Sequence, residues 1–185
     1  MKVSREQIAE NRQNILNAAG RLFREHGFEK VTVAEVMKAA GLTHGGFYGY
    51  FTSKDDLIAQ ALANVIGGST TTALDLDRFT NTYLSPQHCN DVAGGCPTAA
   101  LGGEMCRQTP EARAAVTQGL RRQIERLASS APGGNPSEKR QHAIGSWAAM
   151  VGAVIMARFS DDPALSEEIL TQTRGWIAAT NKEVK

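Results

Sequence analysis

The chain has few cysteines, little net charge and no long apolar run, and each shortage excludes a class of protein. Three cysteines in 185 residues are too few for a scaffold held together by disulfides. No apolar stretch approaches the roughly 20 residues that span a bilayer. The start MKVSREQIAENR lacks the apolar segment of a signal peptide, so we expect a cytoplasmic protein with no membrane partner. A net charge of +1 excludes strong global attraction to nucleic acid.

Strand-like alternation and fixed-period repeats are also absent from the sequence, which favours an all-α fold. With 42% hydrophobic residues, the chain is long enough to form a substantial core. Residues 1–54 contain eight Lys and Arg against five Asp and Glu. This local excess of positive charge gives modest support for phosphate binding by the first part of the chain.

The most informative stretch is Thr32 to Lys54, which has the pattern of two short helices joined by a tight turn. Thr32 and Glu35 form a capping-box pattern at the start of the first helix. Gly41 supplies a residue that tolerates positive φ where that helix must stop. Thr43 is placed to cap a second helix from residue 44 to about residue 51. These signals together predict a helix-turn-helix, whose second helix enters the DNA major groove.

Helical patterns account for most of the remaining chain. Gly67 and Gly68 are expected to weaken or bend the helix that begins near Lys54. Residues 86–97 and 131–137 are irregular by composition. The other predicted helices cover 5–26, 75–85, 98–107, from 110 to about 128, 138–159, and from 163 onward.

The first third of the chain carries a specific motif. It reads Arg12-x2-Ile15-x2-Ala18-Ala19-x2-Leu22-Phe23-x3-Gly27-Phe28, then Thr32-Val33, Ala40-Gly41 and Phe47-Tyr48-x-Tyr50-Phe51-x2-Lys54-x2-Leu57. This motif resembles the N-terminal domain of TetR-type repressors. The resemblance implies an all-α, TetR-like fold of about nine helices. It also implies a DNA-binding domain over residues 1–53 and a signal-sensing and dimerisation domain over residues 54–185.

The resemblance also implies which residues contact DNA. Phe47 and Phe51 are expected to anchor the second helix in the core. Because such motifs bind DNA as dimers, the partner should be a near-palindromic double-stranded operator. The DNA-binding residues implied are Thr32, Thr43, His44, Gly45, Gly46, Tyr48, Tyr50 and Lys54.

The last two helices are apolar around more than one face, so we expect part of that surface to pack against a second subunit. TetR-type repressors form homodimers through this pair as a four-helix bundle. A core confined to one chain is the alternative. The interface residues predicted are Trp147, Val151, Val154, Ile155, Ile169, Trp176 and Ile177.

A second, shorter pattern lies in the middle of the chain, where Gly95-Cys96-Pro97 is followed by Glu104-Met105-Cys106 and a capped helix. It resembles the TetR-type subgroup that responds to reactive electrophiles and oxidants such as N-ethylmaleimide, aldehydes and hypochlorite. The resemblance implies that Cys106 is the sensing thiol and Cys96 an accessory.

Other interpretations of the chain beyond its first third remain open. The cysteines can be ordinary small core residues. A metal site of His88, Cys89, Cys96 and Cys106 has no standard zinc spacing, so we expect neither metal nor cofactor. A small apolar effector could instead bind reversibly near Met105, Trp147, Met150 and Phe159. A helical thiol enzyme is disfavoured because the sequence has no C-x-x-C motif and no evident pair of nucleophile and base.

Overall fold

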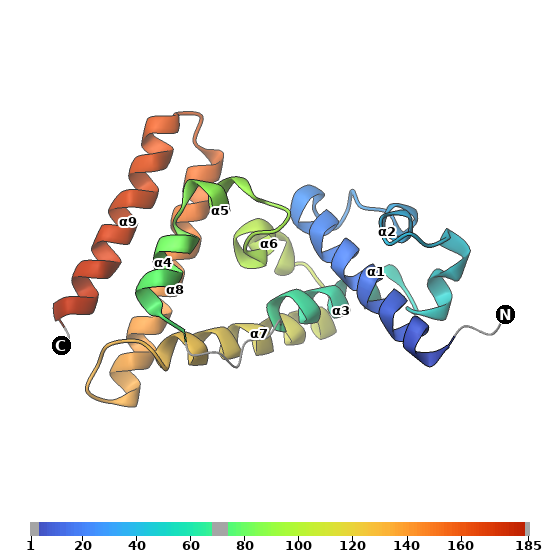
Figure 1. Cartoon of the computed structure of the whole chain (residues 1–185), viewed down its shortest axis with the longest axis horizontal. Coiled ribbons are helices and arrows are strands. Elements are labelled where there is room, and N and C mark those ends of the chain that lie inside the picture. Colours follow the sequence, from blue (N-terminus) through green and yellow to red (C-terminus); the bar gives the residue numbers. More distant parts are fainter. Residues whose placement is uncertain (1–3, 68–73, 184–185) are drawn as a thin grey trace. The chain divides into compact units, whose positions relative to one another are not determined.

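The computed structural model describes residues 4–67 and 74–183, and every regular element within these ranges is a helix (Figure 1). This confirms the all-α prediction. The second element of the helix-turn-helix is a 3-10 helix, labelled η1, and the others are α-helices. The elements are α1 Arg5–His26, α2 Val33–Ala39, η1 His44–Gly49, α3 Lys54–Gly67, α4 Leu76–Tyr83, α5 Pro86–Asn90, α6 Pro97–Met105, α7 Pro110–Ala128, α8 Pro136–Phe159 and α9 Pro163–Glu183.

The chain divides into two compact units that interleave along the sequence. The first comprises Met1–Gly68 and Leu101–Gly119, and the second comprises Ser69–Ala100 and Leu120–Lys185. This division differs from the predicted domain boundary at residue 54, because α3 packs along α1. Residues 101–119 also belong with the N-terminal helices.

In the first unit, α1 and α3 approach each other closely at a glycine. A Cβ atom on Gly20 would lie 2.6 Å from Cγ2 of Val65, so a larger residue there would force the two helices apart. The buried face of α1 consists of Ile15, Leu16, Ala19, Gly20 and Phe23. Ile8, near the start of α1, is exposed.

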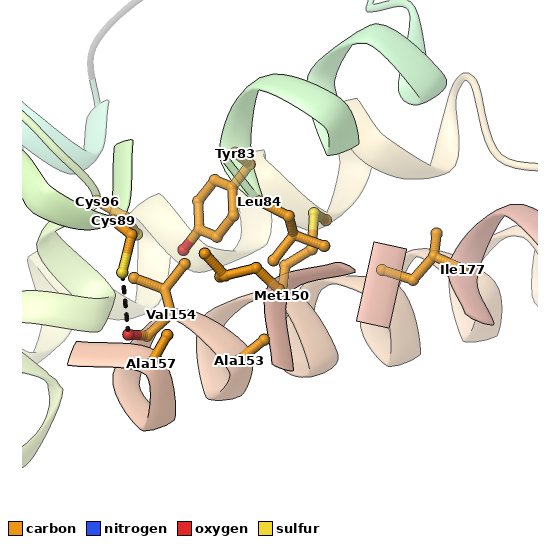
Figure 2. Close-up of a cluster of buried hydrophobic side chains, with 10 residues drawn as sticks. Tyr83, Leu84, Cys89, Cys96, Met150, Ala153, Val154, Ala157 and Ile177 are labelled. Carbon is orange, nitrogen blue, oxygen red and sulfur yellow. Dashed lines mark hydrogen bonds between the residues drawn. The ribbon is translucent and has the colours of Figure 1, made fainter. Parts of the chain in front are cut away.

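The second unit is built on α8 and α9, which follow one another through a short turn and pack along their length. Each begins at a proline with a side-chain cap. The carboxamide oxygen of Asn135 accepts from the amides of Ser137 and Glu138, and the Asp162 carboxylate accepts from the Ala164 amide. Figure 2 shows a core cluster of the second unit, in which Tyr83, Leu84 and Cys89 pack against Met150 and Val154 of α8.

One segment predicted to be irregular contains a short helix. Residues 86–90 form α5, because Ser85 accepts from the His88 amide and Pro86 occupies the first helical position. The expected weak point at Gly67-Gly68 falls at the end of α3, which includes Gly67. Gly68 lies outside the described residues.

Among residues 4–67 and 74–183, one helix, α8, has the length and apolar composition to cross a membrane. This is weak evidence for a membrane span, because core helices of soluble proteins pass the same test. The helix packs against α5 and α9 in the second unit.

Candidate nucleic-acid interface

The first helix of the predicted motif has the predicted ends. Thr32 accepts from the Glu35 amide at 3.2 Å, and the Glu35 carboxylate accepts from the Thr32 amide at 2.7 Å, which completes the capping box. At the other end Gly41 has a φ of 74°. The amides of Gly41 and Leu42 donate to the carbonyls of Lys38 and Met37, which is a Schellman ending. These local bonds determine where α2 stops and the turn begins.

The second helix differs from the prediction in type and in its cap. Residues 44–49 form a 3-10 helix, and Thr43 makes no side-chain capping bond. Three of its six residues, Gly45, Gly46 and Gly49, are poor helix formers that expose backbone to water, so a full α-helical turn gains little here. The burial of two aromatic side chains stabilises this helix instead. Phe47 and Phe51 are buried as predicted, with ring centroids 5.7 Å apart.

The outer face of this motif is open. Tyr48 is 76% exposed, the largest value among the large hydrophobic side chains described. The DNA-contact residues predicted from the sequence that are exposed are Thr32, Thr43, His44, Gly45 and Tyr48. A Cβ on Gly45 would meet no atom within 4 Å, so none of the described residues covers the backbone at this point.

Two residues of the predicted set have partners inside the first unit. Tyr50 is half-buried, and its hydroxyl accepts from the side-chain amide of Asn11 at 3.0 Å. Lys54 is half-buried, and its ammonium group donates to the Glu29 carbonyl at 3.3 Å. Each side chain therefore links the helix-turn-helix to a residue in α1 or just after it. Gly46 is half-buried beside Met37.

A carboxylate at the start of α3 holds the end of the motif in place. Asp56 accepts from the Thr52 amide at 2.9 Å and from the Thr52 hydroxyl at 3.1 Å, while the Asp56 amide donates to Ser53. The bond from the Thr52 amide, aided by Gln60 and the Thr52 hydroxyl, lowers the pKa of Asp56. In the same way, bonds from Thr32 lower the pKa of Glu35. Ionised carboxylates therefore favour both helix starts.

Of the three thiols, one is accessible. Cys106 is exposed, and its thiol donates to the Gly102 carbonyl at 3.7 Å. Cys96 and Cys89 are buried in the core of the second unit. Burial raises the pKa of the Cys89 thiol, although Arg158 opposes this. A reagent in solution would therefore reach Cys106 before the other two.

His88, which the sequence offered only as a candidate metal ligand, holds a loop in the structure. One ring nitrogen lies 2.7 Å from the Tyr83 carbonyl, and the other accepts from the Cys96 amide at 3.2 Å. Arg158 donates to the carbonyls of His88 and Cys89. Burial lowers the pKa of His88. Both ring nitrogens are thus engaged by the backbone, and no group of metal-binding side chains occurs in the described parts of the chain.

A contact that the sequence analysis did not find involves Glu104. Its carboxylate accepts from the amide of Phe28 at 2.8 Å. Both residues belong to the first unit. In the sequence, Glu104 stands out only as part of the Glu-Met-Cys pattern, and no local signal connects it to a residue 76 positions earlier.

The helices α1, α2 and η1, with a Gly41 turn and an open outer face, define a helix-turn-helix domain. Residues 15–61 match the family described as bacterial regulatory proteins, tetR family. The N-terminal part of the chain is therefore similar to this family, as its motif predicted.

Several curated relatives match over less than a third of this chain. The transcriptional regulator AcrR of Shigella flexneri is 39% identical over 57 residues, which are 31% of this chain and 26% of AcrR. The repressor Rv1474c of Mycobacterium tuberculosis is 39% identical over 56 residues, 30% of each chain. These matches thus span less than a third of either relative.

Relatives that match over most of the chain have a lower sequence identity to it. The transcriptional repressor NemR of Escherichia coli is 25% identical over 188 residues, covering 91% of this chain and 94% of NemR. The crystal structure of reduced E. coli NemR superposes with a TM-score of 0.72 at 23% identity, over 91% of this chain and 96% of that one. A TetR regulator of Legionella pneumophila gives a TM-score of 0.71 at 18% identity, over 98% and 100% of the two chains. The structural likeness establishes a common fold, and the relatives are transcriptional regulators rather than enzymes.

Proposed function

We propose that this protein is a cytoplasmic transcriptional repressor that binds a near-palindromic operator as a homodimer. The observation that carries the proposal is the exposed outer face of η1, beneath which Phe47 and Phe51 are fully buried. His44 and Tyr48 project from a rigidly anchored element. The backbone at Gly45 is uncovered, so DNA can approach it closely.

The proposed contacts divide by role. His44 reads base edges, since an imidazole both donates and accepts hydrogen bonds. Tyr48 and Lys54 contact the phosphate backbone, where a hydroxyl and a cation favour binding without reading sequence. Lys54 is already directed by the Glu29 carbonyl, which restrains its side chain.

Substitutions separate these roles on a duplex selected by the parent protein from random-sequence DNA. Tyr48→Ala and Lys54→Ala should weaken binding to all sequences. Lys54→Ala should also reduce, by about one, the slope of the logarithm of the binding constant against the logarithm of the salt concentration. His44→Ala should relax base preference at one position in each half-site, by about 1–3 kcal/mol of discrimination. Thr171→Ala, exposed on α9, is the control. Equal affinity and selectivity in all variants would refute the proposed interface.

The homodimer interface is proposed to be the apolar stripe along α8 and α9. Val154 and Ile177, predicted for this role, are fully buried within the chain, while Trp147, Val151 and Ile169 are partly buried against its core. Ile155 and Trp176, also predicted for this role, are exposed. We therefore assign the interface to the exposed stripe Ile144, Ile155, Met156, Phe159, Leu165 and Trp176.

The signal is proposed to be a reactive electrophile that modifies Cys106. This thiol is the exposed one, and NemR, to which the chain is similar over most of its length, is a transcriptional repressor. Cys96 would act only after the second unit opens, because it is 7% exposed.

A reversible effector is the second candidate, and a specific pocket favours it. An open pocket of about 950 Å³ lies within the second unit. The polar residues around it include Thr80, Asn181 and Arg174, and the apolar ones include Leu76, Ala131 and Ile177. The residues first suggested for an effector lie elsewhere: Met105 and Met150 are buried in the core, and Phe159 is exposed.

Treatment of a protein–operator mixture with N-ethylmaleimide tests the two candidates. Under the first, the reagent releases the DNA, Cys106→Ser abolishes this release, and Cys89→Ser does not. Release that persists in both variants, or reverses on dilution, would support a non-covalent effector. Turnover of an electrophile without DNA would instead favour a thiol enzyme, the third alternative.

A further inference from the structure

The amide of Phe28 is a buried donor that needs an acceptor from outside its own helix. Phe28 is 3% exposed and follows Gly27, the residue at the end of α1. The Gly27 amide bonds to the Phe23 carbonyl, as expected for a helix end. The Phe28 amide instead donates to the Glu104 carboxylate at 2.8 Å. Since a buried amide without a partner is costly, Glu104 stabilises the corner between α1 and α2.

Gly27 leaves room for this carboxylate. Its φ of 83° favours glycine, and a Cβ there would lie 2.6 Å from Oε1 of Glu104. Phe28 in turn packs on Phe23, with ring centroids 5.3 Å apart. The carboxylate is therefore fitted against the backbone at the point where the chain turns from α1 toward α2.

On its other side, Glu104 shares one helical turn with the exposed thiol. The Glu104 carbonyl accepts from the Arg107 amide at 3.1 Å and from the Gln108 side chain at 3.4 Å. Cys106 lies between Glu104 and Arg107 in the chain, and its thiol donates to the Gly102 carbonyl one turn earlier. A change at the sulfur atom thus falls within the turn that holds Glu104.

We infer that Glu104 is a positioning residue that transmits modification of Cys106 to the helix-turn-helix. An adduct on Cys106 removes the bond to Gly102 and adds bulk to the last turn of α6. That turn rearranges, Glu104 leaves the Phe28 amide, and the corner that orients α2 and η1 loosens. This inference rests on the proposed function, because it concerns the same sensing thiol.

The probe is N-ethylmaleimide, and its reaction with the thiol is complete in itself. The thiol proton leaves to solvent, and the sulfur forms a C–S bond to one alkene carbon. The π pair shifts to the other alkene carbon, which takes a proton from water. The result is a stable thioether with no change in oxidation of the protein.

Hydrogen–deuterium exchange of the whole protein, with and without N-ethylmaleimide, tests the inference. In the parent, modification should make the Phe28 amide exchange about tenfold faster. Glu104→Ala should exchange fast in both conditions, and Cys106→Ser slowly in both. Glu104→Gln keeps an acceptor oxygen and should behave as the parent does. Thermal unfolding of each variant checks that the fold is retained.

The outcomes separate this inference from the proposed function. Slow Phe28 exchange in the modified parent, with one adduct on Cys106 by mass spectrometry, overturns the inference. So does slow exchange in Glu104→Ala. If Phe28 responds but affinity for the selected duplex does not, the sensing function fails and the Glu104 link stands. If affinity falls with no change at Phe28, the function stands and the link fails.

Discussion

Gly27 illustrates how one residue meets two requirements. Its φ of 83° and ψ of 166° lie in a region that is almost restricted to glycine. The Glu104 carboxylate occupies the space that a side chain would fill. The sequence predicted the first requirement, because a glycine after an apolar helical face is a common helix ending. It did not predict the second, since Glu104 is distant in the chain.

At this scale, Gly27→Ala should destabilise the protein by about 1–3 kcal/mol, because alanine is strained at this φ and displaces Glu104. Urea unfolding followed by circular dichroism measures the loss. Gly103→Ala is the matched control, since a Cβ there meets no atom within 4 Å in a helix interior. The control should be neutral or more stable by up to about 1 kcal/mol. A Gly27→Ala variant as stable as the parent would contradict this account.

Among the elements, helix starts were predictable and the helix type of η1 was not. Thr32 caps the helix that the sequence assigned to it. Side chains next to other helix starts act in the same way, namely Ser53, Thr109 and Asp162. Such signals act within four residues of the chain, so a sequence displays them directly. The glycines of η1 weaken an α-helical turn, but they do not select 3-10 geometry by themselves, since Phe47 and Phe51 must also reach the core.

The start of α3 makes a prediction about pH. The bond from the Thr52 amide holds the pKa of Asp56 below its ordinary value of 3.8. Because the folded pKa lies below the unfolded one, ionised Asp56 stabilises the fold at pH above about 4. This contribution disappears as the pH falls through the folded pKa.

Accordingly, Asp56→Asn should be less stable than the parent at pH 7 by about 0.5–1 kcal/mol, a small effect because water screens the group. The difference between the two should shrink below about pH 4. Urea unfolding midpoints of both proteins across this range provide the measurement. Asp55→Asn, exposed in the same turn, is the control. A difference that grows on acidification would mean that the pKa of Asp56 is raised.

For the whole molecule, the proposed dimer depends on surface that one chain leaves uncovered. Phe159 is 75% and Trp176 56% exposed, and they belong to an apolar stripe on two packed helices. Large aromatic residues at the centre of such stripes commonly dominate association. The sequence predicted excess apolar surface on α8 and α9. It did not reveal that Val154 and Ile177 serve the chain's own core while Ile155 and Trp176 face outward.

Trp176→Glu should weaken the dimer by at least about 2 kcal/mol, roughly a thirtyfold rise in dissociation constant. Sedimentation velocity over a concentration series measures this change. Thr171→Glu is the control: it is exposed on α9 and lies five residues before Trp176, hence on another face of the helix. If both variants remain dimeric at the same concentrations, the interface lies elsewhere.

The sequence by itself determined the all-α fold, the ends of most helices and the similarity of the N-terminal part to the tetR family. Caps, glycine turns and apolar spacing act over short distances along the chain, so the sequence displays them directly. Only the tertiary structure decided which thiol is accessible, how the helix-turn-helix packs on its anchors, and that Glu104 bonds to Phe28. These features depend on contacts between residues far apart in the sequence. Burial and long-range hydrogen bonds exist only once the helices have packed, so no local pattern specifies them.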